Sequence, residues 1–454
     1  MASTYIGRTQ GSPTNAKKWT ISFWAKFQVT NGNWYPIFGC DYDIGDSYFG
    51  IGSGGHGRNE IGFLEYHTSA TNYGQGSSNF SLRDPSAWYH VVFAYDSTQG
   101  TAANRGKTYI NGVQATNTYS TDIPSNHDSR FNMSGSAISI GRRMRGPVYM
   151  DGVLSHFHFV DGTAYDPTSF GETDSTTGEW KIKANITGVN YGNNGFFVLK
   201  NGNSLTDESP NTNNFTLGNG TLSPAVDNPS NVFATLNPLD KGYVSSALSL
   251  SSGMTVTNAT TNFGDYGIRS TLGASSGKYY WEAKIATANT LCILPMDTKL
   301  VINMSDGSPE NHLYGVQRYN DSTSNIYDNG TFVQNTSAMW GGLTSSDIIS
   351  FALDLDNGKL FLAKNGAYKN QSGSTGDPVN GTNPTFTISD TTRTYGFYSE
   401  MRGNDNNGTI MNFGNGYFGT TAVASAGTNA SNNGTFEYDV PTGYTALSTK
   451  GLNL

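Results

Sequence analysis

Apolar and polar residues alternate along much of this chain, which is the pattern of half-buried β-strands. In the segment from Thr20 to Phe27, every second residue is apolar, which places Ile21, Phe23, Ala25 and Phe27 on one face of the strand. The segment from Trp88 to Tyr95 is almost uniformly apolar and has the length of a buried strand. No helical period of 3.6 residues extends beyond two turns, so the pattern predicts an all-β protein.

Asn-Gly pairs follow three of the strand-like segments, at residues 111–112, 357–358 and 365–366. Asn-Gly favours the type I′ turn of a two-residue hairpin, because both central residues of that turn need a positive φ. Many short strands joined by tight turns are typical of antiparallel sheets. We therefore predict two antiparallel β-sandwiches of the jelly-roll type in tandem.

The length of the chain favours two domains, since 454 residues are too many for one hydrophobic core. The stretch from Asn201 to Ser230 consists largely of Asn, Gly, Ser, Thr and Pro, as linkers and long loops do. We place the boundary near its end, which gives a first domain at residues 1–225 and a second at residues 226–454.

Composition and charge exclude several classes of protein. Aromatic residues make up 13% of the chain and charged residues 14%, the opposite of a disordered composition. A net charge of −8 offers no electrostatic attraction to phosphates, so no nucleic-acid partner is expected. Apolar runs have strand length, so we expect no membrane insertion, and the first residues lack the pattern of a signal peptide. Cys40 and Cys292 fall in different predicted domains, so we expect no disulfide between them.

Carboxylates give two hypotheses about chemistry. Asp41, Asp43 and Asp46 are clustered as the oxygen ligands of a calcium ion would be, although Asp residues beside glycine also form ordinary turns. No other cofactor is expected. A glycoside hydrolase needs two carboxylates about 5–9 Å apart across a cleft. The nearest acidic pair on a strand, Glu60 and Glu65, has an odd spacing that points the two side chains to opposite faces, so we predict no catalytic residue and no enzyme.

Each half of the chain resembles a known family. The first half resembles laminin-G-like, concanavalin-A-like lectin domains at residues 19–24, 88–92, 109–112 and 151–154. The second half resembles SPRY domains at residues 276–282, 352–360, 364–366 and 441–444, and departs from them between Asn289 and Tyr314. Both families are binding scaffolds, and a scaffold alone does not fix the function.

The segment from Phe159 to Lys181, and the order of the two modules, are similar to proteins of marine, cyanophage-like tailed phages. The resemblance implies a virion surface protein, as a tail fibre, knob or capsid decoration, that acts as an adhesion module toward host-surface carbohydrate. Its expected partners are other virion proteins of the capsid or tail, and a homo-oligomer is expected because virion proteins assemble symmetrically. Such a protein is made in the host cytoplasm without a signal peptide and is displayed on the virion surface.

Two alternatives remain open at this stage: a free carbohydrate-binding lectin outside the particle, and a glucan hydrolase. Both the virion adhesion module and the free lectin would bind sugars. In such binding, aromatic rings in loops stack on sugar rings while polar groups form hydrogen bonds with the hydroxyls. The candidate ligand-binding residues are Trp34, Tyr35, Tyr42, Tyr66 and Tyr73 in the first module, and Tyr314, Arg318, Tyr319, Trp340, Tyr398 and Arg402 in the second.

Overall fold

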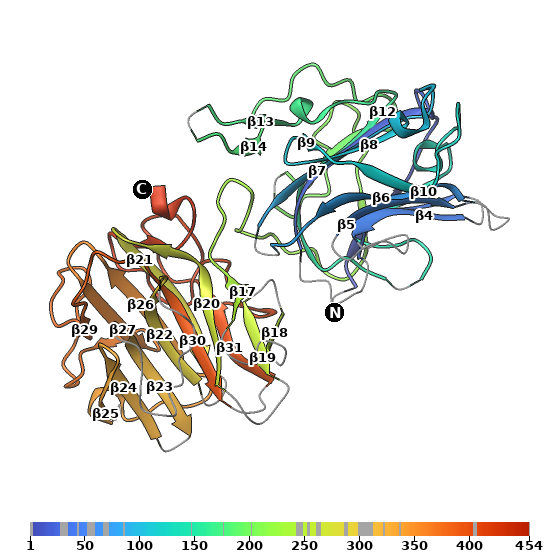
Figure 1. Ribbon diagram of the computed structural model, residues 1–454. Coiled ribbons are helices and arrows are strands. Elements are labelled where there is room, and N and C mark those ends of the chain that lie inside the picture. The colour runs from blue at the N-terminus through green and yellow to red at the C-terminus, as the bar shows by residue number, and fades with distance from the viewer. Residues whose placement is uncertain are drawn as a thin grey trace. The chain divides into compact units, whose positions relative to one another are not determined.

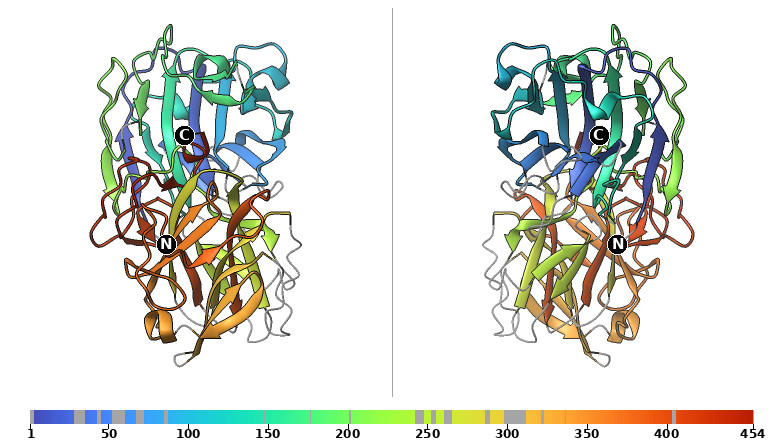
Figure 2. Two further views of the ribbon diagram at one scale, coloured as in Figure 1. Left: turned by 90° about the vertical axis from the view of Figure 1, so that its left-hand side faces the viewer. Right: turned by 90° about the vertical axis from the view of Figure 1, so that its right-hand side faces the viewer.

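The computed structural model of the chain is shown in Figure 1. It describes residues 3–27, 35–42, 45–51, 60–66, 72–84, 87–146, 148–175, 177–200, 202–241, 248–251, 255–259, 265–285, 289–297, 312–320, 323–335, 337–402 and 406–453. Almost all regular structure in these residues is β-strand, as the views in Figure 2 also show, so the prediction of an all-β fold is confirmed. The described residues contain one short α-helix, α1 (Ser337–Trp340), and no helix among them is long or apolar enough to cross a membrane.

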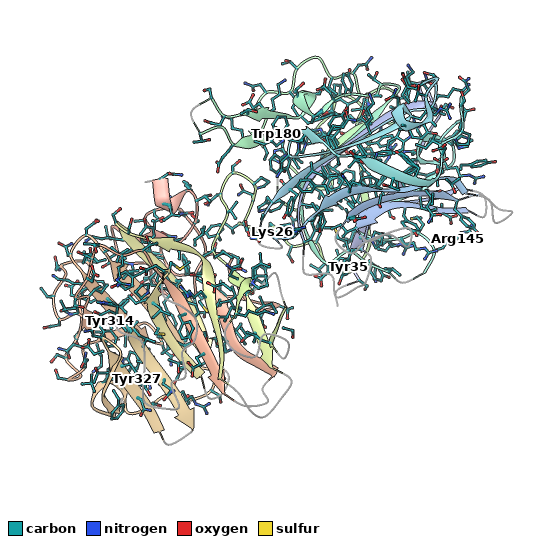
Figure 3. The ribbon with its side chains drawn as sticks, viewed as in Figure 1. Lys26, Tyr35, Arg145, Trp180, Tyr314 and Tyr327 are labelled. Atoms are coloured by element: carbon teal, nitrogen blue, oxygen red, sulfur yellow. The ribbon has the colours of Figure 1, made fainter. Side chains whose placement is uncertain are left out.

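Two compact units make up the chain, residues 1–230 and 231–454. The boundary follows Ser230 rather than residue 225, because Asp227 is fastened to the first unit. Its carboxylate accepts hydrogen bonds from Lys26 Nζ at 2.6 Å and from Trp88 Nε1 at 2.9 Å. The Lys26 side chain, labelled in Figure 3, is almost fully buried at this contact.

The first unit contains two large antiparallel sheets. One has eight strands in the order β10-β6-β5-β4-β3-β11-β1-β16, and the other has six in the order β15-β12-β2-β7-β8-β9. The strands of the first sheet are β1 (Tyr5–Thr9), β3 (Tyr35–Tyr42), β4 (Gly45–Ile51), β5 (Glu60–Tyr66), β6 (Asn72–Ser81), β10 (Asn117–Thr121), β11 (Ala137–Ile140) and β16 (Thr216–Asn219). Those of the second are β2 (Lys18–Phe27), β7 (Tyr89–Asp96), β8 (Gly106–Ile110), β9 (Val113–Gln114), β12 (Gly152–Asp161) and β15 (Phe196–Val198).

Aromatic side chains from both sheets fill the space between them. Trp19 lies at the centre of this core, fully buried, with its ring stacked on Tyr95 at 5.1 Å and on Phe159 at 5.8 Å. Phe131, in a 3₁₀ turn (Arg130–Asn132), closes the core from the connection between β10 and β11. The alternation read from residues 20–27 therefore places one face of β2 in this core.

A third, two-stranded sheet stands apart in the first unit. It is the hairpin of β13 (Gly171–Thr173) and β14 (Trp180–Ile182), drawn in green in Figure 1. In the described part of the chain it pairs with no other strand. The 3₁₀ turn Pro167–Ser169 leads into it, with the Asp166 carboxylate accepting the Thr168 amide at the start of the turn.

The second unit also contains two large sheets. One has seven strands, β17 (Leu236–Lys241), β20 (Asp265–Ala274), β30 (Tyr395–Arg402), β22 (Asn289–Pro295), β23 (Tyr314–Asn320), β24 (Thr323–Asp328) and β25 (Thr331–Asn335). The other has nine, β18 (Leu248–Ser251), β19 (Val256–Ala259), β31 (Asn406–Asn412), β21 (Lys278–Ile285), β26 (Ile348–Asp354), β27 (Lys359–Lys364), β28 (Ala367–Lys369), β29 (Phe386–Thr387) and β34 (Thr445–Ala446). A small hairpin joins β32 (Tyr417–Phe418) to β33 (Thr421–Ala422).

A buried tryptophan also marks the core of the second unit. Trp281 is fully buried and stacks on Phe351 at 5.4 Å, and Phe397 from the other sheet meets both rings edge-on. The neighbouring residue Glu282 points the other way and is equally buried. Its carboxylate accepts the backbone amides of Glu437 and Tyr438, which fastens the C-terminal segment to β21.

The Asn-Gly turns follow the sequence prediction at two of three positions. Asn111 and Gly112 both have positive φ, and so do Asn365 and Gly366, as a type I′ turn requires. At residues 357–358 the prediction is wrong, because only the glycine has a positive φ there. Asp354 instead accepts the Asn357 amide at 3.0 Å, which forms a wider turn of four residues between β26 and β27.

Candidate functional site

A hollow of about 430 Å³ lies in the first unit, between β6 and the segment that joins β10 to β11. It combines one aromatic ring, cationic and anionic side chains, and small polar groups. Its lining residues are Tyr73, Pro124, Ser125, Asn126, His127, Asp128, Arg130 and Met133.

The buried residue Glu65 holds the segment that lines this hollow. It lies on β5 in the same inward-facing row as Ile61 and Phe63, and none of its surface is exposed. Its carboxylate accepts hydrogen bonds from His127 Nε2 at 2.9 Å, from Ser129 Oγ at 3.0 Å and from the Arg130 amide at 2.7 Å. Three donors on one buried carboxylate hold the lining segment in a single conformation.

Tyr73 supplies the aromatic surface of the hollow. Its ring centroid lies 4.3 Å from that of His127, at an interplanar angle of 42°, and the Arg130 guanidinium lies 5.7 Å from the ring centroid. Asn126, in the left-handed region at φ 56°, and Asp128 carry exposed amide and carboxylate groups at the rim. An aromatic ring surrounded by hydrogen-bonding groups of both kinds suits a small polar ligand with an apolar face, such as a sugar ring.

The structure places the other candidates of the first module outside this hollow. Tyr66 ends β5 and Tyr35 begins β3, and both side chains are half-buried; Figure 3 labels Tyr35. Trp34 lies outside the described residues. The backbone of Tyr42 ends β3, but its side chain is outside the described part of the structure. Tyr73 alone among the described candidates lines the hollow.

In the second module, the prediction that Tyr314, Arg318 and Tyr398 face a ligand from loops is wrong. The three residues belong to strands β23 and β30, and their exposed fractions are 0%, 6% and 1%. The Tyr398 hydroxyl donates to the buried Glu400 carboxylate at 3.1 Å. A ring enclosed by neighbouring strands has no free face for stacking, so these aromatics belong to the packing of the sheet.

The remaining candidates of the second module are spread over separate elements. Trp340 ends helix α1 and is half-buried. The backbones of Tyr319 and Arg402 lie in β23 and β30, and their side chains are outside the described residues.

The proposed calcium ligands are described only in part. Asp41 lies in β3, and its carboxylate is bound to Arg145 at 2.9 Å, a pair labelled by its arginine in Figure 3. Asp43 and the side chain of Asp46 lie outside the described residues. Among the residues that are described, no group of three acidic, His or Cys side chains is placed to hold a metal ion. Cys40 and Cys292 are free thiols buried in separate units.

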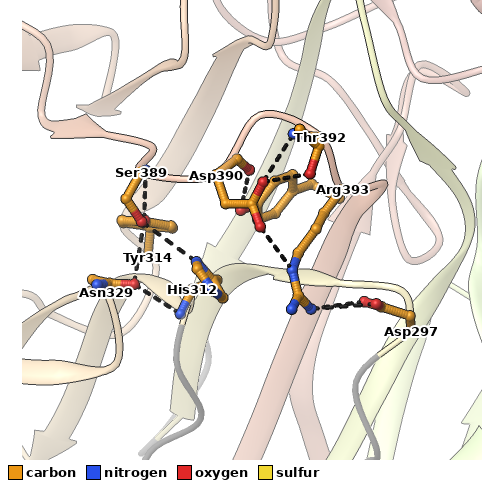
Figure 4. A network of polar contacts seen from close by, with 9 residues as sticks. Asp297, His312, Tyr314, Asn329, Ser389, Asp390, Thr392 and Arg393 are labelled. Carbon is orange, nitrogen blue, oxygen red and sulfur yellow. Dashed lines mark hydrogen bonds and ion pairs between the residues drawn. The ribbon is translucent and has the colours of Figure 1, made fainter.

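A polar network in the second unit combines Ser, His and Asp side chains, but its bonds fasten a loop (Figure 4). Ser389 Oγ lies 2.9 Å from the Tyr314 hydroxyl and a longer 3.4 Å from His312 Nδ1. Asp390 belongs to a separate group, in which hydrogen bonds from Thr392 lower the pKa of its carboxyl and Arg393 pairs with it at 3.1 Å. This network closes the turn before β30.

Sequence reasoning missed Glu65 as a positioning residue, and with it His127 and Arg130. A signal was present, because a glutamate continues the apolar row of Ile61 and Phe63 on an inward face. A charged residue in such a row indicates a buried acceptor with nearby donors. The donors themselves come from a segment 62 to 65 residues further along the chain, which strand spacing cannot predict.

The first unit is therefore a β-sandwich with a hollow that offers an aromatic ring and polar groups to a ligand. Residues 2–167 match a family described as the concanavalin A-like lectin/glucanases superfamily. The match ends before the β13–β14 hairpin and before β15 and β16, which complete the two sheets of the first unit. No curated protein matches the chain.

Three solved structures are distantly similar to this chain. A native heptameric SAP-like pentraxin from Limulus polyphemus has 16% identity, with 36% of this chain and 71% of that chain covered, at a TM-score of 0.27. The SPRY domain of human HERC1 has 13% identity, with 38% and 94% covered, at a TM-score of 0.27. The TRIM65 PSpry domain has 12% identity, with 38% and 86% covered, at the same TM-score. At these scores the likenesses carry no argument about function.

Proposed function

We propose that this chain is a carbohydrate-binding adhesion module without enzymatic activity, and that the hollow at Tyr73 is its sugar site. The observation that carries the proposal is the Tyr73 ring, held beside His127 and Arg130 over a buried Glu65. Sugars are bound in this way, with the apolar face of a pyranose on an aromatic ring and hydroxyls bonded to charged and amide groups at the rim.

A binding role fits the carboxylates of the hollow better than hydrolysis does. Glycoside hydrolysis uses two carboxylates that face each other across the bound sugar. Glu65 is fully buried and already accepts three hydrogen bonds, so it acts as a structural acceptor. Among the described residues that line the hollow, Asp128 at the exposed rim supplies the one carboxylate, so a facing pair is lacking there.

The site is tested by isothermal titration with the best-binding oligosaccharide from an array of host-surface glycans. Tyr73→Ala removes the stacking surface, and we expect it to weaken binding at least tenfold, about 1.4 kcal/mol. Tyr66→Ala is the matched control, because Tyr66 lies on the neighbouring strand outside the hollow. Equal affinity of both variants and the wild type for the oligosaccharide would show that the hollow is not the sugar site.

We further propose that the protein is displayed on the surface of a tailed-phage virion as a symmetric oligomer attached to capsid or tail proteins. The resemblance of residues 159–181 to such phage proteins supports this location, and that segment includes all of the β13–β14 hairpin except its last residue, Ile182. Gold-labelled antibody on purified virions is expected to mark either the tail tip or the capsid. Unlabelled intact particles would favour the free lectin, in which case the same sugar site operates outside the particle.

A further inference from the structure

Trp180 of the β13–β14 hairpin packs against the six-stranded sheet. The hairpin forms no strand pairing with the large sheets, as described above. Trp180, at the start of β14, lies over the Asn111–Gly112 turn, where a Cβ on Gly112 would come within 2.6 Å of the indole. The same ring fills the space beside Gly171 on the opposite strand. Figure 3 labels Trp180 on this hairpin.

The indole of Trp180 ends in a hydrogen bond to a buried histidine. Trp180 Nε1 donates to His90 Nδ1 at 2.8 Å, and His90 Nε2 lies 2.9 Å from Ser22 Oγ. His90 is 1% exposed on β7, with its ring stacked on Trp24 at a centroid distance of 4.9 Å. The histidine is thus enclosed between Trp24 of the sheet and Trp180 of the hairpin.

This geometry fixes the protonation state of His90. An indole N–H is a donor only, so Nδ1 must accept and carry no proton. The single proton of the neutral ring then lies on Nε2, where it is donated to Ser22. A second proton on the ring would place an N–H against the indole N–H, and the hydrogen bond that holds the hairpin would be lost.

We propose that the β13–β14 hairpin is an acid-released strap, latched by the hydrogen bond from Trp180 to the neutral His90. Protonation of His90 opens the latch and swings residues 171–182 away from the sheet, while Phe170 stays packed at the base of the hairpin beside His158. Opening exposes the indole of Trp180 and the imidazole of His90, which are packed against each other at neutral pH.

The surroundings of His90 decide how acidic the opening must be. Burial lowers the pKa of His90 to about 3, with a smaller contribution from the charge of His156. On β12, burial also lowers the pKa of His156 to about 4 and that of His158 well below its usual range, and the Lys200 ammonium lowers both further. The titratable groups that influence His90 are therefore cationic when protonated, so the first proton taken up in this cluster opposes the next.

The strap is tested by following the indole ¹⁵N–¹H signals of the full chain during an acid titration. The seven tryptophans give seven signals, and Trp180→Phe identifies the one from the hairpin. We expect this signal to move to the position of a solvent-exposed indole at a higher pH than that at which the other six collapse. A Trp180 signal that changes only together with the other six would overturn the proposal.

Two variants separate the latch from general acid unfolding. His90→Gln keeps an acceptor for Trp180 and a donor for Ser22 but does not titrate, so the hairpin signal should stay in place through the acid range. His127→Gln is the control, because His127 lies in the hollow and away from the hairpin, and the acid step should persist. A step at the same pH in His90→Gln would show that His90 is not the trigger.

A measurement at neutral pH keeps the proposal testable if His90→Gln fails to fold. Trp180→Phe removes the donor and keeps a ring in the same place, so the strap should already be loose. Trypsin should then cleave after Lys181, which is about half exposed on the hairpin, at least fivefold faster than in the wild type. An unchanged cleavage rate would mean that the hydrogen bond does not hold the hairpin.

Discussion

At the scale of single residues, buried carboxylates organise the loops of this protein. Charged residues are scarce, yet Asp161, Glu65 and Glu282 are all at most 2% exposed. Each accepts several hydrogen bonds from backbone amides or side chains of distant segments. A buried carboxylate is stable only when such donors surround it, so each of these residues fixes the loop that supplies the donors.

Asp161 gives the sharpest test of this principle. Its carboxylate accepts the amides of Thr14, Asn15 and Asn194 and the side-chain amide of Asn132, at 2.6 to 3.1 Å. Asp161→Ala leaves these donors buried without an acceptor, and we expect the free energy of unfolding of the first unit to fall by about 3–5 kcal/mol. Urea unfolding of the full chain, followed by hydrogen exchange of peptides from residues 3–27, measures the change.

A matched substitution tests the role of burial. Asp174→Ala removes a carboxylate on the hairpin, where it pairs with the exposed Lys181. An exposed pair contributes little, so a loss below about 1 kcal/mol is expected. Comparable losses in the two variants would contradict the assignment of Asp161 as a structural hub.

At the scale of elements, the alternation of apolar residues along the strands explains why one face of each sheet is buried. Whether the other face is buried depends on the segments that pack over it. The outward face of β2, β7 and β12 carries Trp24, His90 and His158. All three side chains are buried, so this face is not in contact with solvent. The segment after β12 covers this face: the Phe170 ring lies 5.1 Å from that of His158, and the Tyr191 hydroxyl lies 2.8 Å from His158 Nδ1. Polar residues on an outward face therefore became buried, because a connection far along the chain packs over them.

This covered face predicts a dependence of stability on acid. The pKa of His90 is lowered to about 3 and that of His156 to about 4, whereas an unfolded histidine titrates near 6.5. Below pH 6.5 the unfolded chain binds more protons than the folded chain, so the free energy of unfolding falls as the pH drops. Each of the two histidines is expected to remove about 2 kcal/mol between pH 7.5 and pH 5.

Urea unfolding at several pH values measures this loss. In His90→Gln the dependence of the first unit on pH should become shallower by the share of one histidine. A curve for His90→Gln parallel to that of the wild type over pH 7.5 to 5 would show that His90 titrates normally in the folded chain.

At the scale of the whole molecule, the division into two units is decided by contacts of the junction. Composition placed the boundary at residue 225, within a polar stretch that has no apolar pattern. Asp227 nevertheless belongs to the first unit, because it neutralises the buried Lys26 and accepts the indole of Trp88. A charged lysine in a buried position requires such a partner.

Asp227→Asn tests this anchoring of the junction. The change leaves the Lys26 ammonium buried without its counter-ion, and we expect the first unit to lose about 3 kcal/mol of stability, while the second unit keeps its own transition. Differential scanning calorimetry of the full chain separates the two transitions. Asp41→Asn is the control, since the Asp41–Arg145 pair is exposed and should contribute less than about 1 kcal/mol. A loss that appears in the second unit instead would contradict the assignment.

The sequence by itself determined the all-β class, the strands with strong alternation and two of the three Asn-Gly turns. These features depend on residues that are neighbours in the sequence. It also named Tyr73 as one of five candidate aromatics of the first module, although it expected a loop where the structure has strand β6. Only the tertiary structure decided that Tyr73 meets His127 and Arg130, that Tyr314 and Tyr398 are packed inside sheets, and how the hairpin is held. Those outcomes depend on pairings between segments tens to hundreds of residues apart, which local patterns do not specify.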